Sequence, residues 1–307
     1  MASPSIRRPW LAALLNLLFP GLGHLYAGDL RGAALWFVLP VLGIALVAGA
    51  VLFLPTSVLV VLLTWAIPLG FFIVQGVTGW GAARRAPAPF TPTPLNRWYW
   101  YLGFAALSGC FYAYAARPFF RDHFVQAFRI PSDSMSPTMI VGDYIMVDRR
   151  QRVGRQVAVG DLVVFRSIED PALQLVKRVA GVAGDTLQMW GGALIRNWVR
   201  QQDDPFYDPA AATPLDAPQL ALVRTWQIPV FARPVPPNYT PDPSNWGPIV
   251  VPSGHFFAIG DDRNHSWDSR YYGFVPDSNL LGRPRLIYWN SSFLLPGMLA
   301  RVGMAPK

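Results

Sequence analysis

Three serines occupy alternate positions in one short polar segment of the chain. They are Ser132, Ser134 and Ser136, within residues 130–139, which read IPSDSMSPTM. A serine hydroxyl is a weak nucleophile, and it attacks a carbonyl carbon only when a neighbouring base takes its proton. The segment therefore predicts covalent catalysis if the fold brings a base to it, and a linker without a chemical role if it does not.

One lysine is a candidate for that base. The chain contains 24 Arg and two Lys, and Lys177 is the lysine that is not the last residue. It falls in the apolar run of residues 173–179. An arginine keeps its proton in proteins, whereas the amine of a desolvated lysine can lose it. Lys177 therefore predicts a general base, and a solvent-exposed strand end is the alternative.

A third polar cluster covers residues 260–276, which read GDDRNHSWDSRYYGFVP. Its three aspartates are potential metal ligands, but Arg263 and Arg270 would repel a cation, so we expect neither a metal ion nor another cofactor. His265 in this cluster and His255 before it are further candidate bases. Neither histidine has the spacing of a metal ligand or of a catalytic triad, so we expect both to be solvated loop residues.

The elements that must position these clusters begin with membrane helices. Hydrophobic residues make up 52% of the chain and charged residues 14%, and no charge falls between Arg31 and Arg84. Uncharged runs of this length are rare in the cores of soluble proteins. We therefore predict three helices long enough to cross a bilayer, at residues 33–54, 58–77 and 98–116.

A weaker apolar stretch, residues 10–26, precedes the first span. Pro20, Gly21 and Gly23 interrupt it, so it predicts an interfacial or re-entrant helix, with a cleaved signal as the alternative. Arginines precede this stretch and lie between the second and third spans, and an excess of arginine marks the cytoplasmic side. The third span then leads outward, so the chain after Arg117 is expected outside the cytoplasm.

The remainder of the chain is typical of a β domain. Short β-prone runs are separated by Gly, Pro and Asp, at residues 144–147, 161–165, 173–179, 256–259 and 285–289. A Pro-rich segment at about 198–248 predicts an insertion with little regular structure. The predicted organisation is an N-terminal membrane region over 1–97, an anchor helix over 98–116 and a mainly antiparallel β domain over 117–307.

Taken together, the three clusters resemble bacterial type I signal peptidases, the Ser–Lys proteases of family S26. The matching segments PSDSMSPT, KRVAGVAGD and GDDRNHSWDSRYYGFVP follow in this order within residues 124–284. The chain has Asp133 and Asp262 where many relatives have Gly and Asn, and Met139 and Ala183 where they have Leu and Pro. The resemblance implies an N-terminal α-helical transmembrane region followed by a mainly antiparallel β catalytic domain of the signal-peptidase type.

The resemblance also implies a role for each matching residue. Ser134 is expected to be the nucleophile, Lys177 the general base, and Ser266 a hydrogen-bond partner that orients the lysine amine. The Ser132 hydroxyl and the Ser134 N–H are expected to form the oxyanion hole. Two structural ion pairs are expected as well, Asp261 with Arg178 and Asp268 with Arg270.

The implied activity is removal of signal peptides from exported preproteins at Ala-x-Ala-like sites, through an acyl-enzyme. The expected place is the bacterial cytoplasmic membrane, with several spans and the catalytic domain on its outer face. Expected partners are preprotein signal peptides and the lipid bilayer, with the export machinery as a further candidate. Nucleic acid is not expected, because the basic residues behind the net charge of +8 are scattered. A specialised maturation peptidase of the same family and a non-catalytic membrane scaffold remain as alternatives.

Overall fold

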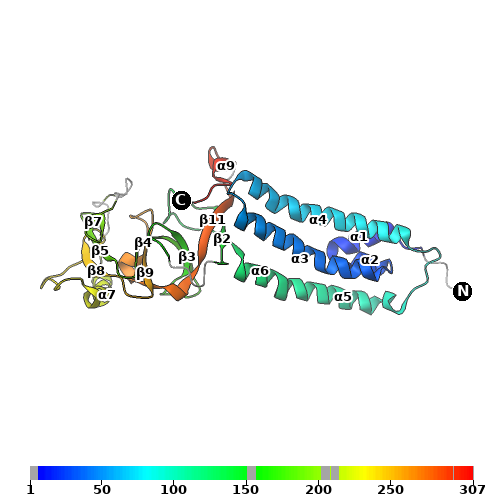
Figure 1. The fold of residues 1–307 in the computed structure, drawn as a ribbon, viewed down its shortest axis with the longest axis horizontal. Helices are drawn as coiled ribbons and strands as arrows, with labels where there is room; N and C mark the ends of the chain where they lie inside the picture. The colour runs from blue at the N-terminus through cyan, green and yellow to red at the C-terminus, as the bar shows by residue number, and fades with distance from the viewer. Residues whose placement is uncertain (1–5, 151–156, 202–207, 209–213, 293, 307) are drawn as a thin grey trace. The chain divides into compact units, whose positions relative to one another are not determined.

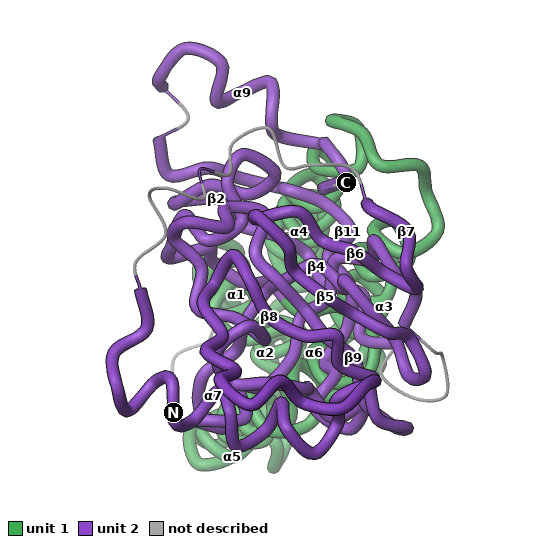
Figure 2. The backbone as a smooth tube through the Cα atoms, turned by 90° about the vertical axis from the view of Figure 1, so that its left-hand side faces the viewer, with its two compact units in different colours: residues 1–126 green, residues 127–307 purple. Residues whose placement is uncertain are grey.

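The chain divides into two compact units, residues 1–126 and 127–307 (Figure 2). The computed structural model describes residues 6–150, 157–201, 208, 214–292 and 294–306. The first unit is helical, and the second consists mainly of β-strands (Figure 1). This is the predicted order of a helical region followed by a β domain.

Helices of very different length build the first unit. They are α1 (Pro9–Leu18), α2 (Leu22–Tyr26), α3 (Leu30–Phe53), α4 (Val58–Arg85), the 3-10 turn η1 (Pro94–Asn96), α5 (Trp98–Phe111), the π-helical segment η2 (Tyr112–Ala116) and α6 (Arg117–His123). Two of them, α3 and α4, are long and apolar enough to cross a membrane, judged by length and composition. The third predicted span begins at Trp98 as expected, but helical structure continues beyond residue 116 to His123.

The stretch predicted as an interfacial or re-entrant helix forms a pair of short helices, α1 and α2. The chain turns between them at Gly21, whose φ of +92° favours glycine. Asn16 is fully buried, and its Oδ1 accepts hydrogen bonds from Gly21 N at 3.0 Å and Gly23 N at 3.1 Å. Asn16 Nδ2 also donates to Gln75 O at 2.5 Å, and Gln75 Nε2 donates to Asn16 O at 2.6 Å. These bonds satisfy buried polar groups and hold the hairpin against α4.

The described part of the second unit contains two sheets. The strands are β1 (Val125–Arg129), β2 (Asp143–Asp148), β3 (Leu162–Arg166), β4 (Gln174–Val182), β5 (Thr186–Trp190), β6 (Ala193–Arg196), β7 (Val199–Arg200), β8 (Trp246–Val250), β9 (His255–Ile259), β10 (Val275–Pro276) and β11 (Leu280–Asn290). The larger sheet has the order β1-β2-β11-β3-β4-β9-β10, and its pairs from β2 to β10 are antiparallel. The smaller sheet, β7-β6-β5-β8, is antiparallel throughout.

The predicted β runs correspond to strands β2, β3, β4, β9 and β11, but the Pro-rich segment differs from its prediction. Its described part contains the 11-residue helix α7 (Ala217–Gln227) and the start of β8. The helix begins with a capping box, in which the Asp216 side chain accepts from Gln219 N and the Gln219 side chain accepts from Asp216 N. This local signal overrides the high proline content. Residues 202–207 and 209–213 of the segment lie outside the described residues.

Candidate active site

Ser134 lies in a loop between β1 and β2 that is closed at its base. Ile130 N, after the end of β1, donates to the carbonyl oxygen of Asp143 at 2.8 Å. Inside the loop, Met135 and Met139 are 2% and 0% exposed, and they pack in the hydrophobic cluster between β2, β3 and β11. Met135 and Met139 anchor the loop after Ser134, and Ile130, which is buried in the same cluster, anchors it before Ser134, so the half-buried Ser134 is held in one position.

Lys177 lies on β4, where it pairs in register with Val163 of β3. Its side chain is buried, at 3% exposure, and its Nζ is 2.6 Å from Ser134 Oγ. Burial lowers the pKa of Lys177, and the charge of Arg270 lowers it further, against the opposing carboxylates of Asp268 and Asp261. A hydroxyl in contact with a buried amine of lowered pKa is the arrangement that activates a serine for acyl transfer.

The loop after β9 reaches this site because of strand register. Arg178, the neighbour of Lys177, pairs with Ile259, the last residue of β9, so the residues that follow lie beside β4. Arg178 Nε and Nη2 donate to the two carboxylate oxygens of Asp261 at 2.7 and 2.6 Å. Thr138, in the Ser134 loop, donates to Asp261 Oδ2 at 2.6 Å. The carboxylate therefore links β4, the loop after β9 and the loop that carries Ser134.

Asp268 and Arg270 form the second ion pair, which is almost completely buried. Their side chains are 0% and 1% exposed, with contacts of 2.9 Å from Nε to Oδ1 and 3.0 Å from Nη2 to Oδ2. Asp268 Oδ2 also accepts from Gly260 N at 2.9 Å. Burial alone would raise the pKa of Asp268, but Arg270 and the Gly260 N–H hold it below its usual value. The opposite charges of the two side chains compensate each other, so the pair can hold the loop in shape although it is buried.

Ser132 and Ser266, the two serines expected to support catalysis, lie close to Ser134 in different ways. Ser132 is exposed, and its Oγ is 3.3 Å from Ser134 Oγ. Ser266 is buried at 5% exposure, and no hydrogen bond joins its Oγ to Lys177 or to any other described residue. A Cβ at Gly260 would come within 2.2 Å of Ser266 Oγ and 2.5 Å of Ser134 O. Ser266 is therefore close to the loop that carries Ser134, although the expected hydrogen bond to the lysine amine is not formed.

The alternative bases lie elsewhere. His265 is 77% exposed and interacts with Asp262 through its ring Nδ1 at 3.0 Å, and His255 Nδ1 lies 2.9 Å from Ser253 O. Within the described residues, no group of three His, Cys, Asp or Glu side chains is placed to hold a metal ion.

Three further residues support the site without having been predicted from the sequence. Thr138 links Asp261 to the Ser134 loop, and Gly260 permits the close approach of Ser266. Both belong to the matching motifs, so the sequence contained a signal for them. Arg301, in the helix α9 (Met298–Arg301), lies outside these motifs. Its Nη2 donates to Asp143 Oδ2 at 2.6 Å and to Thr138 O at 2.9 Å.

Comparisons with known proteins identify the family of the chain. A family model described as signal peptidase, peptidase S26, matches residues 104–289. The chain is 30% identical to a signal peptidase I of Leptolyngbya laminosa over 55% of this chain and 71% of that protein. It is 27% identical to a signal peptidase I of Aquifex aeolicus over 56% of this chain and 78% of that protein.

A solved structure of a signal peptidase I from Enterococcus faecalis is 25% identical, with a TM-score of 0.27, over 42% of this chain and 97% of that chain. The family model covers more than half of the present chain, from α5 almost to the end of β11, and includes Ser134, Lys177 and Ser266. The chain therefore belongs to the signal peptidase family, peptidase S26.

Proposed function

We propose that this serine endopeptidase removes signal peptides with Ser134 as its nucleophile and Lys177 as its general base. The observation that supports these roles is the 2.6 Å contact between Lys177 Nζ and Ser134 Oγ, made by an amine that is 3% exposed. Since burial lowers the pKa of Lys177, its amine loses a proton more readily than the amine of a solvent-exposed lysine does. Only the neutral amine accepts the serine proton.

The reaction proceeds in two stages. Lys177 Nζ accepts the proton of Ser134 Oγ while the oxygen attacks the scissile carbonyl carbon. The resulting ammonium gives this proton to the departing amine, which leaves an ester between Ser134 and the signal peptide. In the second stage the neutral amine deprotonates a water molecule, which attacks the ester carbonyl. The signal peptide leaves with a free carboxylate, and Ser134 regains its hydroxyl.

The supporting serines stabilise charges that appear during these steps. The Ser132 hydroxyl and the Ser134 N–H donate to the oxyanion of the tetrahedral intermediate, where one such donor contributes about 3 kcal/mol. The Ser266 hydroxyl is buried and without a hydrogen bond among the described residues, so it is available to accept a bond from the Lys177 ammonium. This accounts for a polar atom that would otherwise be buried at a cost.

The proposed substrates are preproteins whose signal peptides end in an Ala-x-Ala-like segment. Such a segment binds in extended form, in which alternate side chains enter shallow pockets. The bilayer is the second proposed partner, since α3, α4 and the helical run from Trp98 to His123 would anchor the enzyme in it. Arg84, Arg85 and Arg97 support a cytoplasmic position for residues 86–97 and a position outside a bacterial inner membrane for the catalytic unit. Because substrates arrive during export, the export machinery is a further proposed partner.

A serine scan tests the assignment of the nucleophile. We expect Ser134→Ala to lose cleavage of a co-expressed preprotein by several orders of magnitude, measured as the ratio of mature to full-length mass. Ser132→Ala should lose about 10²–10³-fold, the effect of one oxyanion donor. Ser136→Ala is the matched control, since no described hydrogen bond involves its side chain, and it should cleave normally. Cleavage by Ser134→Ala together with an inactive Ser136→Ala would show that another serine attacks.

A further inference from the structure

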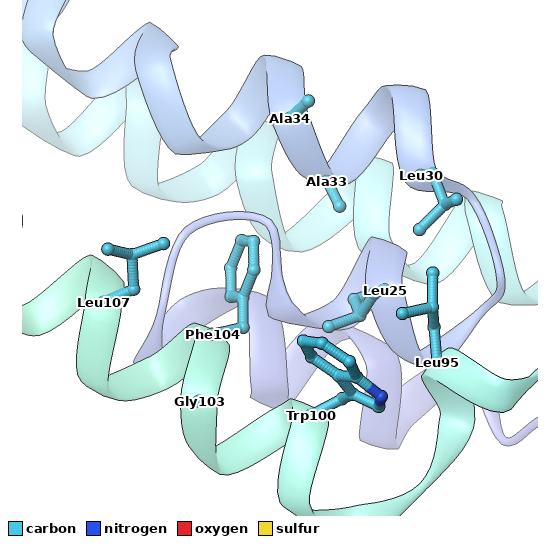
Figure 3. Close-up of a pocket in the computed structure, with 9 residues that line it drawn as sticks. All are labelled: Leu25, Leu30, Ala33, Ala34, Leu95, Trp100, Gly103, Phe104 and Leu107. Carbon is cyan, nitrogen blue, oxygen red and sulfur yellow. The ribbon is translucent and has the colours of Figure 1, made fainter.

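An apolar pocket of about 410 Å³ lies within the helical unit, between α2, α3 and α5 (Figure 3). Its walls include Leu25, Leu30, Ala33, Trp100, Phe104 and Leu107, and no charged side chain lines it. The volume is that of a typical small-molecule site, but the few polar groups that orient a polar ligand are missing. The pocket therefore fits a hydrocarbon chain.

One face of α5 forms a wall of the pocket. Trp100, Gly103, Phe104 and Leu107 are spaced as i, i+3, i+4 and i+7, so they share this face. Figure 3 shows Phe104 and Leu107 pointing toward α3 and Ala33 pointing back at them. Gly103 lies between the large side chains, and a Cβ at this position would meet no atom within 4 Å. Apart from the two chain neighbours of Gly103 and the backbone of its own helix, no protein atom therefore occupies the space in front of it.

The hairpin of α1 and α2 fixes the remaining wall. Leu25 of α2 lines the pocket, and its carbonyl oxygen accepts a hydrogen bond from Asn96 Nδ2 at 3.1 Å. Asn16 anchors the start of α2 through Gly21 and Gly23. The peptidase motifs assign no role to residues 20–28. Here their bonds keep the pocket formed without a ligand, which lowers the entropic cost of binding one.

Two exposed arginines adjoin the residues that line the pocket. Arg31 follows Leu30, and Arg97 follows Leu95 by two positions. Within the described residues, no carboxylate pairs with either guanidinium. The acidic group nearest in sequence, Asp29, already accepts a hydrogen bond from Gly32 N at 2.9 Å. Arg97 Nη1 donates to the Tyr99 hydroxyl at 3.1 Å, a neutral partner that does not compensate the positive charge of the guanidinium. The apolar lining of the pocket is thus followed in sequence by two cations.

We propose that this pocket binds one acyl chain of an anionic phospholipid whose phosphate contacts Arg31 and Arg97. The inference rests on the proposed insertion of α3 and α4 into a bilayer. An excess of arginine marks this end of the helices as cytoplasmic. The pocket then lies in the cytoplasmic leaflet, which is rich in anionic lipids. The hairpin is then a lipid-binding module that is independent of the peptidase chemistry.

Native mass spectrometry of the full chain in detergent tests the pocket. The probes are dioleoyl phosphatidylglycerol and, as the zwitterionic comparison, dioleoyl phosphatidylcholine. We expect the parent to retain one phosphatidylglycerol. Gly103→Leu fills the empty space and should reduce this retention about tenfold or more without disturbing the helix, because leucine favours helices. Gly70→Leu on α4 is the matched control, since a Cβ there also meets no atom within 4 Å, and it should bind as the parent does.

Arginine variants test the headgroup. Each guanidinium near an anionic lipid should contribute about fivefold in affinity. The double variant Arg31→Gln, Arg97→Gln should therefore abolish the preference for phosphatidylglycerol while phosphatidylcholine binding persists. The single variant Arg84→Gln should leave the preference intact.

Three outcomes would overturn the proposal. Two of them are equal phosphatidylglycerol retention by Gly103→Leu and Gly70→Leu, and the lack of a headgroup preference in the parent. The third is displacement of phosphatidylglycerol by an equimolar apolar peptide, which would assign the pocket to a protein segment. Carbonate washing of membranes tests the insertion separately.

Discussion

Lys177 can work as a base only if its neutral form is populated, and neighbouring side chains decide this. Its burial lowers the pKa of the amine. Asp268 would raise that pKa, but it is bound on both carboxylate oxygens by Arg270, so much of its field is cancelled. A carboxylate that helps to build the loop is thereby tolerated close to an amine that must give up its proton.

Replacing Lys177 by Arg should abolish catalysis as completely as replacing it by Ala. A guanidinium keeps its charge and cannot accept the Ser134 proton near neutral pH. We expect a loss of about 10²–10⁴-fold in kcat/KM, the contribution of a general base. The assay is cleavage of a peptide with Ala at the −1 and −3 positions, in detergent. The parent should also gain activity with rising pH, at an apparent pKa below the usual value for lysine.

Retained function would contradict the Ser–Lys assignment. If Lys177 were only an ion-pair partner, Arg would replace it at a cost of about 1 kcal/mol or less. Activity of Lys177→Arg within tenfold of the parent would therefore exclude it as the base. His265→Ala serves as the control, because His265 is exposed, and this variant should keep full activity.

Lys177 should also lower the stability of the fold. Because its folded-state pKa is lowered, the unfolded chain binds more protons between that pKa and the usual lysine value of about 10.4. The parent should become more stable with rising pH across this window. Lys177→Met removes the burial cost, so its melting temperature should exceed that of the parent near neutral pH, and the gap should narrow toward pH 10. A gap that stays constant with pH would show that packing, not charge, causes it.

At the scale of elements, the Ser134 loop is held from three directions. Met135 and Met139 anchor it in the core, and Thr138 connects it to Asp261 in the loop after β9. From the C-terminal helix α9, Arg301 donates to Thr138 O and to the fully buried Asp143. Two of these three supports come from segments distant in sequence, so Ser134 is positioned only after both have packed.

Arg301→Gln should therefore lower kcat about tenfold with little change in KM, because it loosens the nucleophile loop without touching the substrate. Its melting temperature should also fall, since it leaves a buried carboxylate with fewer donors. Arg196→Gln is the matched control, because Arg196 likewise pairs with a buried carboxylate, Asp185, at 3.2 Å but in the smaller sheet. That variant should lose stability and keep kcat. Equal losses of kcat in both variants would reduce Arg301 to a general stabilising role.

At the scale of the whole molecule, the distribution of arginine predicts one orientation in the membrane. Arg84 and Arg85 lie in the last turn of α4 and Arg97 directly precedes α5, so these residues should stay in the cytoplasm. A reporter fused after Lys307 that needs export, such as alkaline phosphatase, should be active, whereas a cytoplasm-dependent fluorescent reporter should be dark. Fusions after Ala86 are the control and should behave in the opposite way. Fluorescence from the fusion after Lys307 would reverse the topology.

The sequence by itself determined the class of the protein. Long uncharged runs predict membrane helices because unpaired charges are costly in lipid, and alternating short β-prone runs predict an antiparallel domain. Lys177 could be recognised as a candidate base because the chain has 24 Arg and only two Lys, so a lysine at an internal position is unusual. Both ion pairs were expected from the resemblance to a known family. The pair between Arg178 and Asp261 joins positions 83 residues apart, and such a long-range contact leaves no local trace in one chain.

Only the tertiary structure decided how these residues are supported. The hydrogen bond between Arg301 and Asp143 joins positions 158 residues apart, and no sequence pattern near either residue predicts it. Strands β5, β6 and β8 were missed, because pairing with neighbours outweighs their weak local preference. The pocket at Gly103 exists because α2, α3 and α5 meet without filling the space. Such features depend on which side chains come together after folding. The periodicity of apolar residues in the sequence cannot predict them, because it indicates only which face of a helix or strand is apolar.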